Sequence, residues 1–260
     1  MKKDYSRFAD STVFEGIVSL RALISVMENC DFKNDRKIQT VLYDENRLKS
    51  EKKEFAWLSH RSEELGFKIE LVSREDIEDL SVGNTHGGII AKAGERSYLQ
   101  LEGNICDNGF YVILDGIEDP YNFGYALRSL YASGVDGVIL GKRNWMSAAG
   151  VVCRASAGAS ELMNLYLCED MADAVSYMKK SGYKVVCADI ENSVSIYDCD
   201  LTAPVLCVVG GEKRGISKSV MSQADSIIRI DYGRTFGASL SAASAATVLG
   251  FEVLRQKIKK

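Results

Sequence analysis

The stretch "YVILDGIEDPYNFGYALRSL", residues 111–130, decides the fold because it joins an apolar strand to an amphipathic helix. The apolar run ends at Asp115, and the helix is expected to begin at Pro120, where the missing N–H of proline costs no hydrogen bond. Asp119 is a favourable N-cap in front of it. Three apolar residues then recur at helical spacing, which predicts one buried face; they are Phe123, Leu127 and Leu130.

Two polar residues of this helix lie outside the apolar stripe. Asn122 falls in the first turn, close to the carboxyl end of the strand, and Arg128 projects from another side. Arg128 has two readings: an ordinary exposed arginine, or a side chain directed toward the crevice at the end of the strand.

Further apolar runs follow, and helical segments lie between most of them. Runs of this kind are typical of parallel strands that are covered on both faces. The sequence therefore predicts an α/β fold with an open, mainly parallel sheet, whose ligands bind at the carboxyl ends of the strands. The predicted strands are 111–114, 137–140, 162–167, 183–188, 205–209 and 227–230.

A smaller α/β unit precedes this sheet. It combines an amphipathic helix over 12–29 and a charged helix over 53–65 with strands over 38–43, 67–72 and 88–93. A polar stretch rich in glycine and asparagine follows and is typical of a linker. We predict an N-terminal domain over 1–95, a linker over 96–109 and a C-terminal domain over 110–260.

Composition limits the possible functions. No apolar run approaches the length of a membrane span, and the first residues lack the apolar core of a secretory signal. The seven cysteines form no C-x-x-C pair and there are only two histidines, so neither a disulfide framework nor a metal site is indicated. We expect a cytoplasmic protein without membrane or metal. Its net charge of −4 means that any surface for nucleic acid must be local.

Two later stretches are candidates for chemistry. "PVLCVVGGEKRGIS", residues 204–217, runs from a buried strand into a glycine-rich turn whose backbone amides could hold an anion. Glu212 in this turn is either a helix cap or a functional carboxylate. "SLSAASAATVLGFEVLRQ", residues 239–256, begins as a helix of small residues, which could admit another helix, a second subunit or a flat ligand.

Together these stretches resemble the SpoU or TrmH-type ribose 2'-O-methyltransferases of the SPOUT class. Residues 114–134 resemble the first motif of that family, with Asn122 and Arg128 at its two polar positions. Residues 208–217 resemble the second motif and residues 239–256 the third. The segment "RASAGA", residues 154–159, is also similar to one that the family carries, and the resemblance covers residues 108–260.

The resemblance implies transfer of a methyl group from S-adenosylmethionine to a ribose 2'-hydroxyl of RNA. It implies that Arg128 acts on this hydroxyl, that Asn122 and Glu212 hold the arginine, and that Ser239 contributes nearby. Because guanidinium stays protonated, stabilising a developing alkoxide is easier for Arg128 than accepting the proton. The residues implied to bind the cofactor are Gly210, Gly215, Ile230, Leu240 and Ser241. A trefoil knot and a homodimer are further implications.

The N-terminal unit adds a weaker resemblance. Gly16 and the turn over 84–88 look like the L30e-like RNA-recognition domain of members that modify 23S ribosomal RNA. The third motif departs from the family, because Asp231, Tyr232 and Ser241 replace its usual proline, methionine and asparagine. A non-catalytic RNA-binding role therefore remains an alternative, and an enzyme that acts on transfer RNA is a second one. A doubly wound nucleotide-binding enzyme is a third, although residues 210–215 lack the G-x-G-x-x-G spacing.

Overall fold

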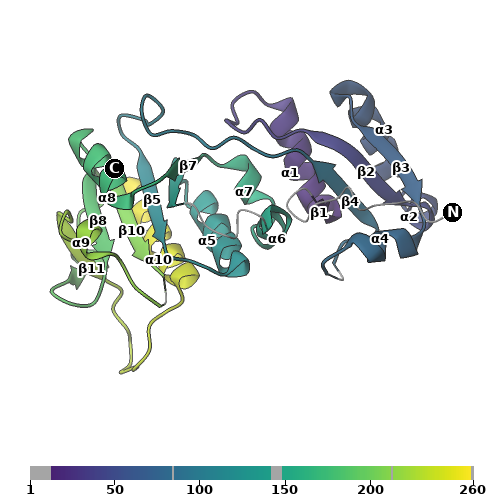
Figure 1. Cartoon of the computed structure of the whole chain (residues 1–260). Coiled ribbons are helices and arrows are strands. Elements are labelled where there is room, and N and C mark those ends of the chain that lie inside the picture. The colour runs from purple at the N-terminus through teal and green to yellow at the C-terminus, as the bar shows by residue number, and fades with distance from the viewer. Residues whose placement is uncertain (1–12, 84, 142–147, 212, 259–260) are drawn as a thin grey trace. The chain divides into compact units, whose positions relative to one another are not determined.

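The computed structural model describes residues 13–83, 85–141, 148–211 and 213–258 (Figure 1). Packing divides the chain into two compact units. Unit 1 comprises Met1–Ser97 and Trp145–Leu162, and unit 2 comprises Tyr98–Asn144 and Met163–Lys260. Glu212, Asn84 and the segment 142–147 lie outside the described residues, so the predictions made for Glu212 and Asn84 have no structural counterpart here.

Unit 1 contains a four-stranded sheet in the order β1-β4-β2-β3. Strands β2 and β3 are parallel, whereas β4 is antiparallel to both β1 and β2. The elements that the N-terminal segment contributes are β1 (Val13–Glu15), α1 (Gly16–Glu28), β2 (Ile38–Asp44), α2 (Glu45–Ser50), α3 (Lys52–Leu65), β3 (Lys68–Val72), α4 (Arg74–Leu80) and β4 (Ile89–Ala93). The predicted separate N-terminal α/β domain is confirmed.

The start of unit 1 differs from the predicted helix over 12–29. Val13–Glu15 form a strand, and the helix begins only at Gly16, which has a φ of +82°. This left-handed conformation is accessible to glycine without strain, and it lets the chain turn sharply from β1 into α1. Helical periodicity alone did not reveal the turn.

Two short helices from the middle of the chain also belong to unit 1. They are α6 (Ala149–Ala155) and α7 (Ala159–Leu162), and they lie beside α1 (Figure 1). A Cβ on Gly150 would come within 1.9 Å of the Val13 carbonyl oxygen, so the backbones of α6 and β1 are in direct contact. The predicted domain boundaries follow chain order and place this segment in the C-terminal domain, whereas its packing places it in unit 1.

Buried charges fasten α6 and α7 within unit 1. Arg154 pairs with Glu15, and Arg36 Nε lies 3.0 Å from Glu161 Oε2 with both side chains at most 4% exposed. Asn34 donates to the same Glu161 oxygen over 3.0 Å. Because an uncompensated buried charge is costly, these contacts fix the segment to the sheet of unit 1.

Unit 2 contains a seven-stranded sheet in the order β7-β6-β5-β10-β8-β11-β9, and every pairing in it is parallel. The predicted mainly parallel sheet is confirmed. The strands are β5 (Phe110–Asp115), β6 (Gly137–Gly141), β7 (Leu165–Cys168), β8 (Lys184–Ala188), β9 (Val194–Ser195), β10 (Val205–Gly210) and β11 (Ser226–Arg229). The strand predicted over 162–167 is shifted, because Leu162 closes α7 and β7 begins only at Leu165.

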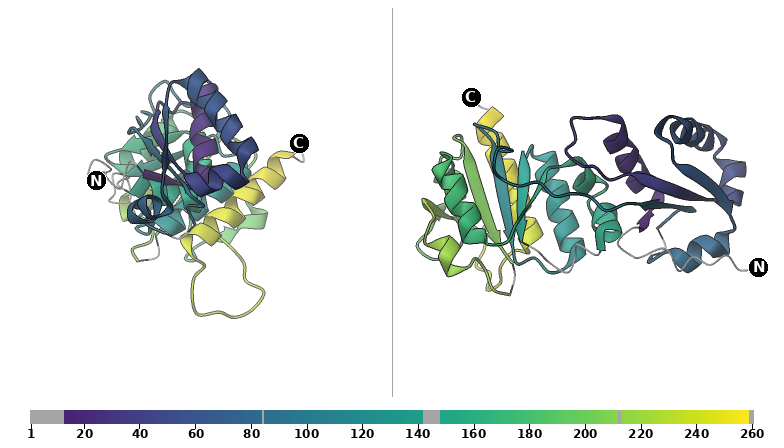
Figure 2. Two further views of the ribbon diagram at one scale, coloured as in Figure 1. Left: turned by 90° about the vertical axis from the view of Figure 1, so that its right-hand side faces the viewer. Right: turned by 45° about the horizontal axis from the view of Figure 1, so that its top comes forward.

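Helices cover both faces of this sheet (Figures 1 and 2). Helices α8 (Met171–Lys180) and α9 (Lys218–Met221) pack on the face that carries Tyr111 and Ile113. Helices α5 (Pro120–Ala132) and α10 (Ala242–Ile258) pack against each other on the opposite face. At this crossing a Cβ on Gly250 would lie 2.5 Å from the Ser133 hydroxyl, so the two helices approach closely. A short 3₁₀ turn (Ile196–Asp198) follows β9.

The predicted linker is largely packed on unit 2. Leu99 forms a parallel bridge with Tyr166, and Leu101 is only 3% exposed. Three tyrosine hydroxyls hold the rest of the segment: Tyr166 donates to the Asn104 carbonyl over 2.7 Å, Tyr111 accepts from the Cys106 amide, and Tyr183 donates to the Cys106 carbonyl. The chain is therefore ordered up to the start of β5.

Within the described ranges, no helix is long and apolar enough to cross a membrane. The same residues contain no group of three or more histidine, cysteine, aspartate or glutamate side chains that could hold a metal ion.

Candidate active site

The candidate site lies at the carboxyl edge of the sheet of unit 2, where β5 and β10 end side by side. These strands are parallel neighbours, and their last residues, Asp115 and Gly210, are partners in the register. The Gly211 amide donates to the Asp115 carbonyl over 2.5 Å. A Cβ on Gly211 would lie 2.3 Å from the Gly116 carbonyl oxygen, so only glycine allows the two loops to approach this closely.

The glycine-rich turn after β10 folds back on itself. The Gly215 amide donates to the Gly211 carbonyl over 3.0 Å, and Gly215 has a φ of +62°. A Cβ on Gly210 would lie 2.5 Å from the Gly215 carbonyl carbon. Backbone packing therefore accounts for the glycines at both predicted cofactor positions in this turn.

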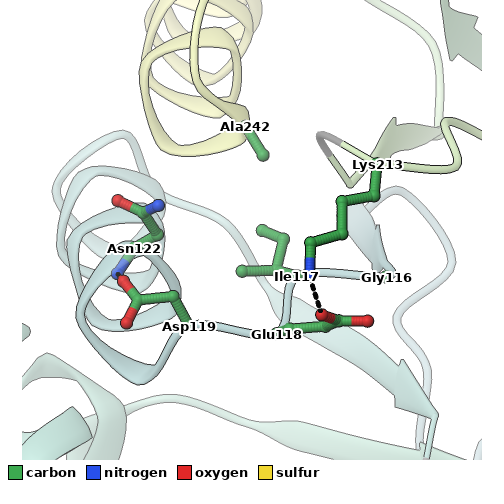
Figure 3. A pocket seen from close by; sticks show the side chains of 7 residues that line it. All are labelled: Gly116, Ile117, Glu118, Asp119, Asn122, Lys213 and Ala242. Carbon is green, nitrogen blue, oxygen red and sulfur yellow. Dashed lines mark hydrogen bonds and ion pairs between the residues drawn. The ribbon is translucent and has the colours of Figure 1, made fainter.

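Asn122 faces a pocket of about 120 Å³ at this edge (Figure 3). Asp119 caps α5 as predicted, because its carboxylate accepts a hydrogen bond from the backbone amide of Asn122 over 2.8 Å. The pocket is lined by Gly116, Ile117, Glu118, Asp119, Asn122, Lys213 and Ala242. Its wall thus combines the loop after β5, the turn after β10 and the first residue of α10, which come from the three motif regions.

Two predicted catalytic residues do not line this pocket. Arg128 is exposed on α5, six residues beyond Asn122, which places it about 9 Å further along the helix and about 120° around it. Ser239 is exposed in the loop over 231–240, every residue of which is exposed. Figure 2 shows this loop projecting from unit 2 between β11 and α10. Among the described residues, Asn122 is the predicted catalytic residue that lines the pocket.

The remaining predicted cofactor residues lie at the two ends of the exposed loop. Ile230 directly follows β11, and Leu240 and Ser241 precede α10. The Leu240 amide donates to the Tyr232 hydroxyl over 3.0 Å, which links the beginning and the end of the loop. Since β11 is parallel to β10, both ends of this loop belong to the same edge of the sheet as the pocket.

Ser241 has an identifiable role despite its departure from the family motif. Its hydroxyl accepts from the Ser244 amide over 3.2 Å, which is the bond that an N-cap side chain makes at the start of a helix. Serine and asparagine are comparably good N-caps. The replacement at this position therefore preserves the start of α10, next to Ala242 of the pocket wall.

Glu118, Lys213 and Ala242 also line the pocket, although no motif in the sequence marks them as site residues. Lys213 Nζ lies 2.8 Å from Glu118 Oε2, so an ion pair joins the two loops beside the pocket (Figure 3). Their signal in the sequence was only that each adjoins a motif position. No pattern in the sequence paired two residues 95 positions apart.

Comparison with known proteins assigns the family. Residues 109–251 match the SpoU rRNA methylase family, and residues 31–99 match the RNA 2'-O ribose methyltransferase substrate-binding domain. The chain belongs to the SpoU rRNA methylase family. It is an RNA ribose 2'-O-methyltransferase whose methyl donor is S-adenosylmethionine.

Relatives cover most of the chain. A TrmH-family tRNA/rRNA methyltransferase of Staphylococcus saprophyticus is 31% identical over 195 residues, which cover 73% of this chain and 78% of the relative. RlmB of Shewanella oneidensis, a 23S rRNA (guanosine-2'-O-)-methyltransferase, is 27% identical over 205 residues, or 77% of this chain and 83% of RlmB.

Solved structures share the fold. An AdoMet-bound rRNA methyltransferase from Sinorhizobium meliloti superposes with a TM-score of 0.77 and 22% identity, covering 95% of this chain and 88% of that one. The SpoU methyltransferase AviRb from Streptomyces viridochromogenes, in complex with AdoMet, superposes with a TM-score of 0.74 and 20% identity. The match covers 95% of this chain and 91% of that one. These likenesses support the SPOUT-type fold predicted from the motifs.

Proposed function

We propose that this enzyme methylates a ribose 2'-hydroxyl of 23S ribosomal RNA, with the reaction at the pocket that Asn122 lines. The observation that carries the proposal is the convergence of all three motif regions on this one pocket at the carboxyl edge of the sheet. The substrate-binding match over 31–99 and relatives named as 23S rRNA methyltransferases support ribosomal RNA as the substrate.

The residues at the edge of the sheet fit the cofactor in two respects. Gly210 and Gly211 present backbone without side chains, and the carboxylate of Asp119 lines the pocket, which suits a positively charged sulfonium. S-adenosylmethionine supplies an activated methyl group when it is bound. The pocket is smaller than the roughly 300 Å³ of most ligand sites, so we assign the rest of the cofactor site to the remaining predicted residues, which are Gly215, Ile230, Leu240 and Ser241.

The protein's remaining tasks are to align the hydroxyl and to stabilise the oxygen as it loses its proton. Asn122 can donate its amide N–H to the ribose oxygens while its carbonyl accepts. We assign the stabilisation of the developing alkoxide to Arg128, whose charge persists at any working pH. Glu212 and Ser239 complete the proposed catalytic set by family resemblance.

We further propose that the active enzyme is a homodimer. Four aromatic side chains on α5 and α10 are unusually exposed for their size: Tyr121 at 42%, Tyr125 at 50%, Tyr131 at 39% and Phe251 at 45%. Aromatic side chains are enriched in interface cores. Sedimentation of Phe251→Glu beside the wild type tests this proposal, because a charge in a buried interface should yield a monomer. A dimer that persists in the variant contradicts an interface at Phe251.

The enzyme is proposed to work in the cytoplasm, as expected for a substrate in ribosomal RNA and for a chain whose seven cysteines show no disulfide spacing.

Transfer of labelled methyl to unmodified ribosomal and transfer RNA tests the reaction and the role of Arg128. Wild type should label ribosomal RNA as 2'-O-methylribose, and Arg128→Ala should lower kcat at least about 100-fold while calorimetry shows unchanged cofactor affinity. The control Arg61→Ala removes a partly buried arginine from α3 of unit 1 and should leave kcat unchanged. Label in transfer RNA alone would replace the proposed substrate, and cofactor binding without any label would indicate a non-catalytic RNA-binding protein.

A further inference from the structure

The ion pair between Lys213 and Glu118 stands beside the pocket (Figure 3). Lys213 belongs to the turn after β10 and Glu118 to the loop after β5, and both line the pocket together with Asn122. Among the described residues that line this pocket, Lys213 is the single lysine or arginine. An anion that is bound next to Asn122 would therefore meet Lys213 first.

This ion pair is poorly suited to a structural role. The Lys213 side chain is 79% exposed and the Glu118 side chain 56%. Exposed pairs of this kind contribute little to stability, because water screens both charges and two flexible side chains must be ordered. The hydrogen bond that Lys213 donates to the Glu118 carboxylate raises the pKa of Lys213, so the lysine stays charged. Glu118 thus holds the Lys213 ammonium beside the pocket. Another anion can replace Glu118 as its partner at low cost.

The proposed reaction supplies such an anion. In RNA the 2'-hydroxyl is on the carbon next to the one that carries the 3'-phosphate, so delivering the hydroxyl to Asn122 brings a negative charge into the same small pocket. We propose that Lys213 is a substrate-binding residue that leaves Glu118 and binds the phosphate on the 3' side of the target ribose. This inference rests on the proposed function and adds the contact that orients the ribose.

Glu118 has a defined part in this exchange. Without RNA it holds Lys213 at the pocket and offsets its charge. When a phosphate replaces it, the carboxylate returns to water, which costs little because it is already more than half exposed. Exposed Arg214 and Lys218 follow in the same stretch and add to the local positive potential despite the overall charge of −4.

Four variants separate phosphate binding from a structural link. Lys213→Met removes the cation, Glu118→Gln releases it, and the double variant Glu118→Lys with Lys213→Glu restores an ion pair of reversed polarity. Lys180→Met is the matched control, because it removes an exposed lysine from the end of α8, which leads to the amino end of β8 at the opposite edge of the sheet. The measurements are KM and equilibrium affinity for 23S rRNA transcribed in vitro, at several salt concentrations, and the affinity for S-adenosylmethionine.

Lys213→Met is expected to raise KM for the RNA about three- to ten-fold and to reduce the slope of log affinity against log salt by about 0.7–0.9, the amount for one phosphate contact. Cofactor affinity and the unfolding midpoint should not change. Glu118→Gln should bind RNA at least as tightly as wild type. The double variant should be no better than Lys213→Met, and Lys180→Met should resemble wild type.

Recovery of RNA affinity in the double variant would overturn the inference, because it would show that the link between the loops is what matters. An unchanged salt slope in Lys213→Met would overturn it as well. If the wild type transfers no methyl group at all, the proposed function fails, and the salt dependence of equilibrium RNA binding still decides the role of Lys213.

Discussion

Replacing Glu161 by glutamine should unfold unit 1 far more easily, although Glu161 lies 125 residues from its partner Arg36. The Glu161 side chain is 3% exposed and that of Arg36 4%. Glutamine keeps the shape of the side chain but leaves the Arg36 guanidinium without its counter-ion in a buried site. It also gives Asn34 a weaker acceptor in place of the carboxylate oxygen that it now contacts.

The size of the effect follows from burial. Removing one partner of a buried ion pair costs about 3–5 kcal/mol, because the remaining charge is desolvated without compensation. A unit of about 100 residues loses roughly 4 °C of Tm for each kcal/mol, so the transition of unit 1 should fall by roughly 12–20 °C. Breaking an exposed ion pair would lower the free energy of unfolding by at most about 1 kcal/mol.

Tryptophan fluorescence in urea follows this transition through Trp57, which lies in α3 of unit 1. Glu63→Gln, which removes an exposed carboxylate from α3, is the matched control and should change the free energy of unfolding by less than about 0.5 kcal/mol. The double variant Arg36→Met with Glu161→Leu should recover most of the loss, because replacing both charges with apolar side chains is often neutral. A loss below about 1 kcal/mol in Glu161→Gln would refute the reasoning, since water would then be reaching Arg36.

Two further predictions follow from the glycine turn and the tyrosine cluster. Gly210→Ala should weaken cofactor binding at least about ten-fold in a calorimeter, because its Cβ would lie 2.5 Å from the Gly215 backbone. The control Gly94→Ala should not change the affinity, because the nearest atom to its Cβ would lie 3.8 Å away. Equal affinities of the two variants would contradict the tight turn. Burial raises the pKa of Tyr183 to about 12 from 10.0, so the stability that its neutral hydroxyl provides is complete below pH 10 and lost as pH rises through 12. The urea midpoint of wild type should therefore fall more steeply over this range than that of Tyr183→Phe, and identical slopes would show that Tyr183 titrates normally.

The sheet and the edge that carries the site could be predicted because their signals are local. Each apolar run reports a buried strand, and Asp119 with Pro120 marks the start of α5 to the residue. Parallel pairing then places the ends of β5 and β10 together without any knowledge of contacts. The position of Asn122 at the pocket follows from this chain of local signals.

Other features depend on pairings that periodicity does not encode. The apolar face of α6 shows that the helix is buried but not against which sheet, and its partner Glu15 lies 139 residues before Arg154. No sequence pattern indicates the ion pair between Lys213 and Glu118 either, because the two residues are 95 positions apart. Ser241 differs, because its spacing to Ser244 is a local capping pattern that the sequence alone contains.

The path of the chain has a consequence for how recognition and chemistry are joined. The chain leaves unit 1 after Ser97, returns to it at Trp145 and leaves it again after Leu162, so three crossings connect the units. A fragment that ends at Ser97 would lack Arg154 beside Glu15 and Glu161 beside Arg36, which leaves two buried charges without these counter-ions. The fragment would also lack Cys153, which packs in the core of unit 1, so it should be less stable than unit 1 of the whole chain. Unit 1 is therefore a part of the enzyme that folds with a segment taken from between β6 and β7, and not a module appended to a catalytic domain.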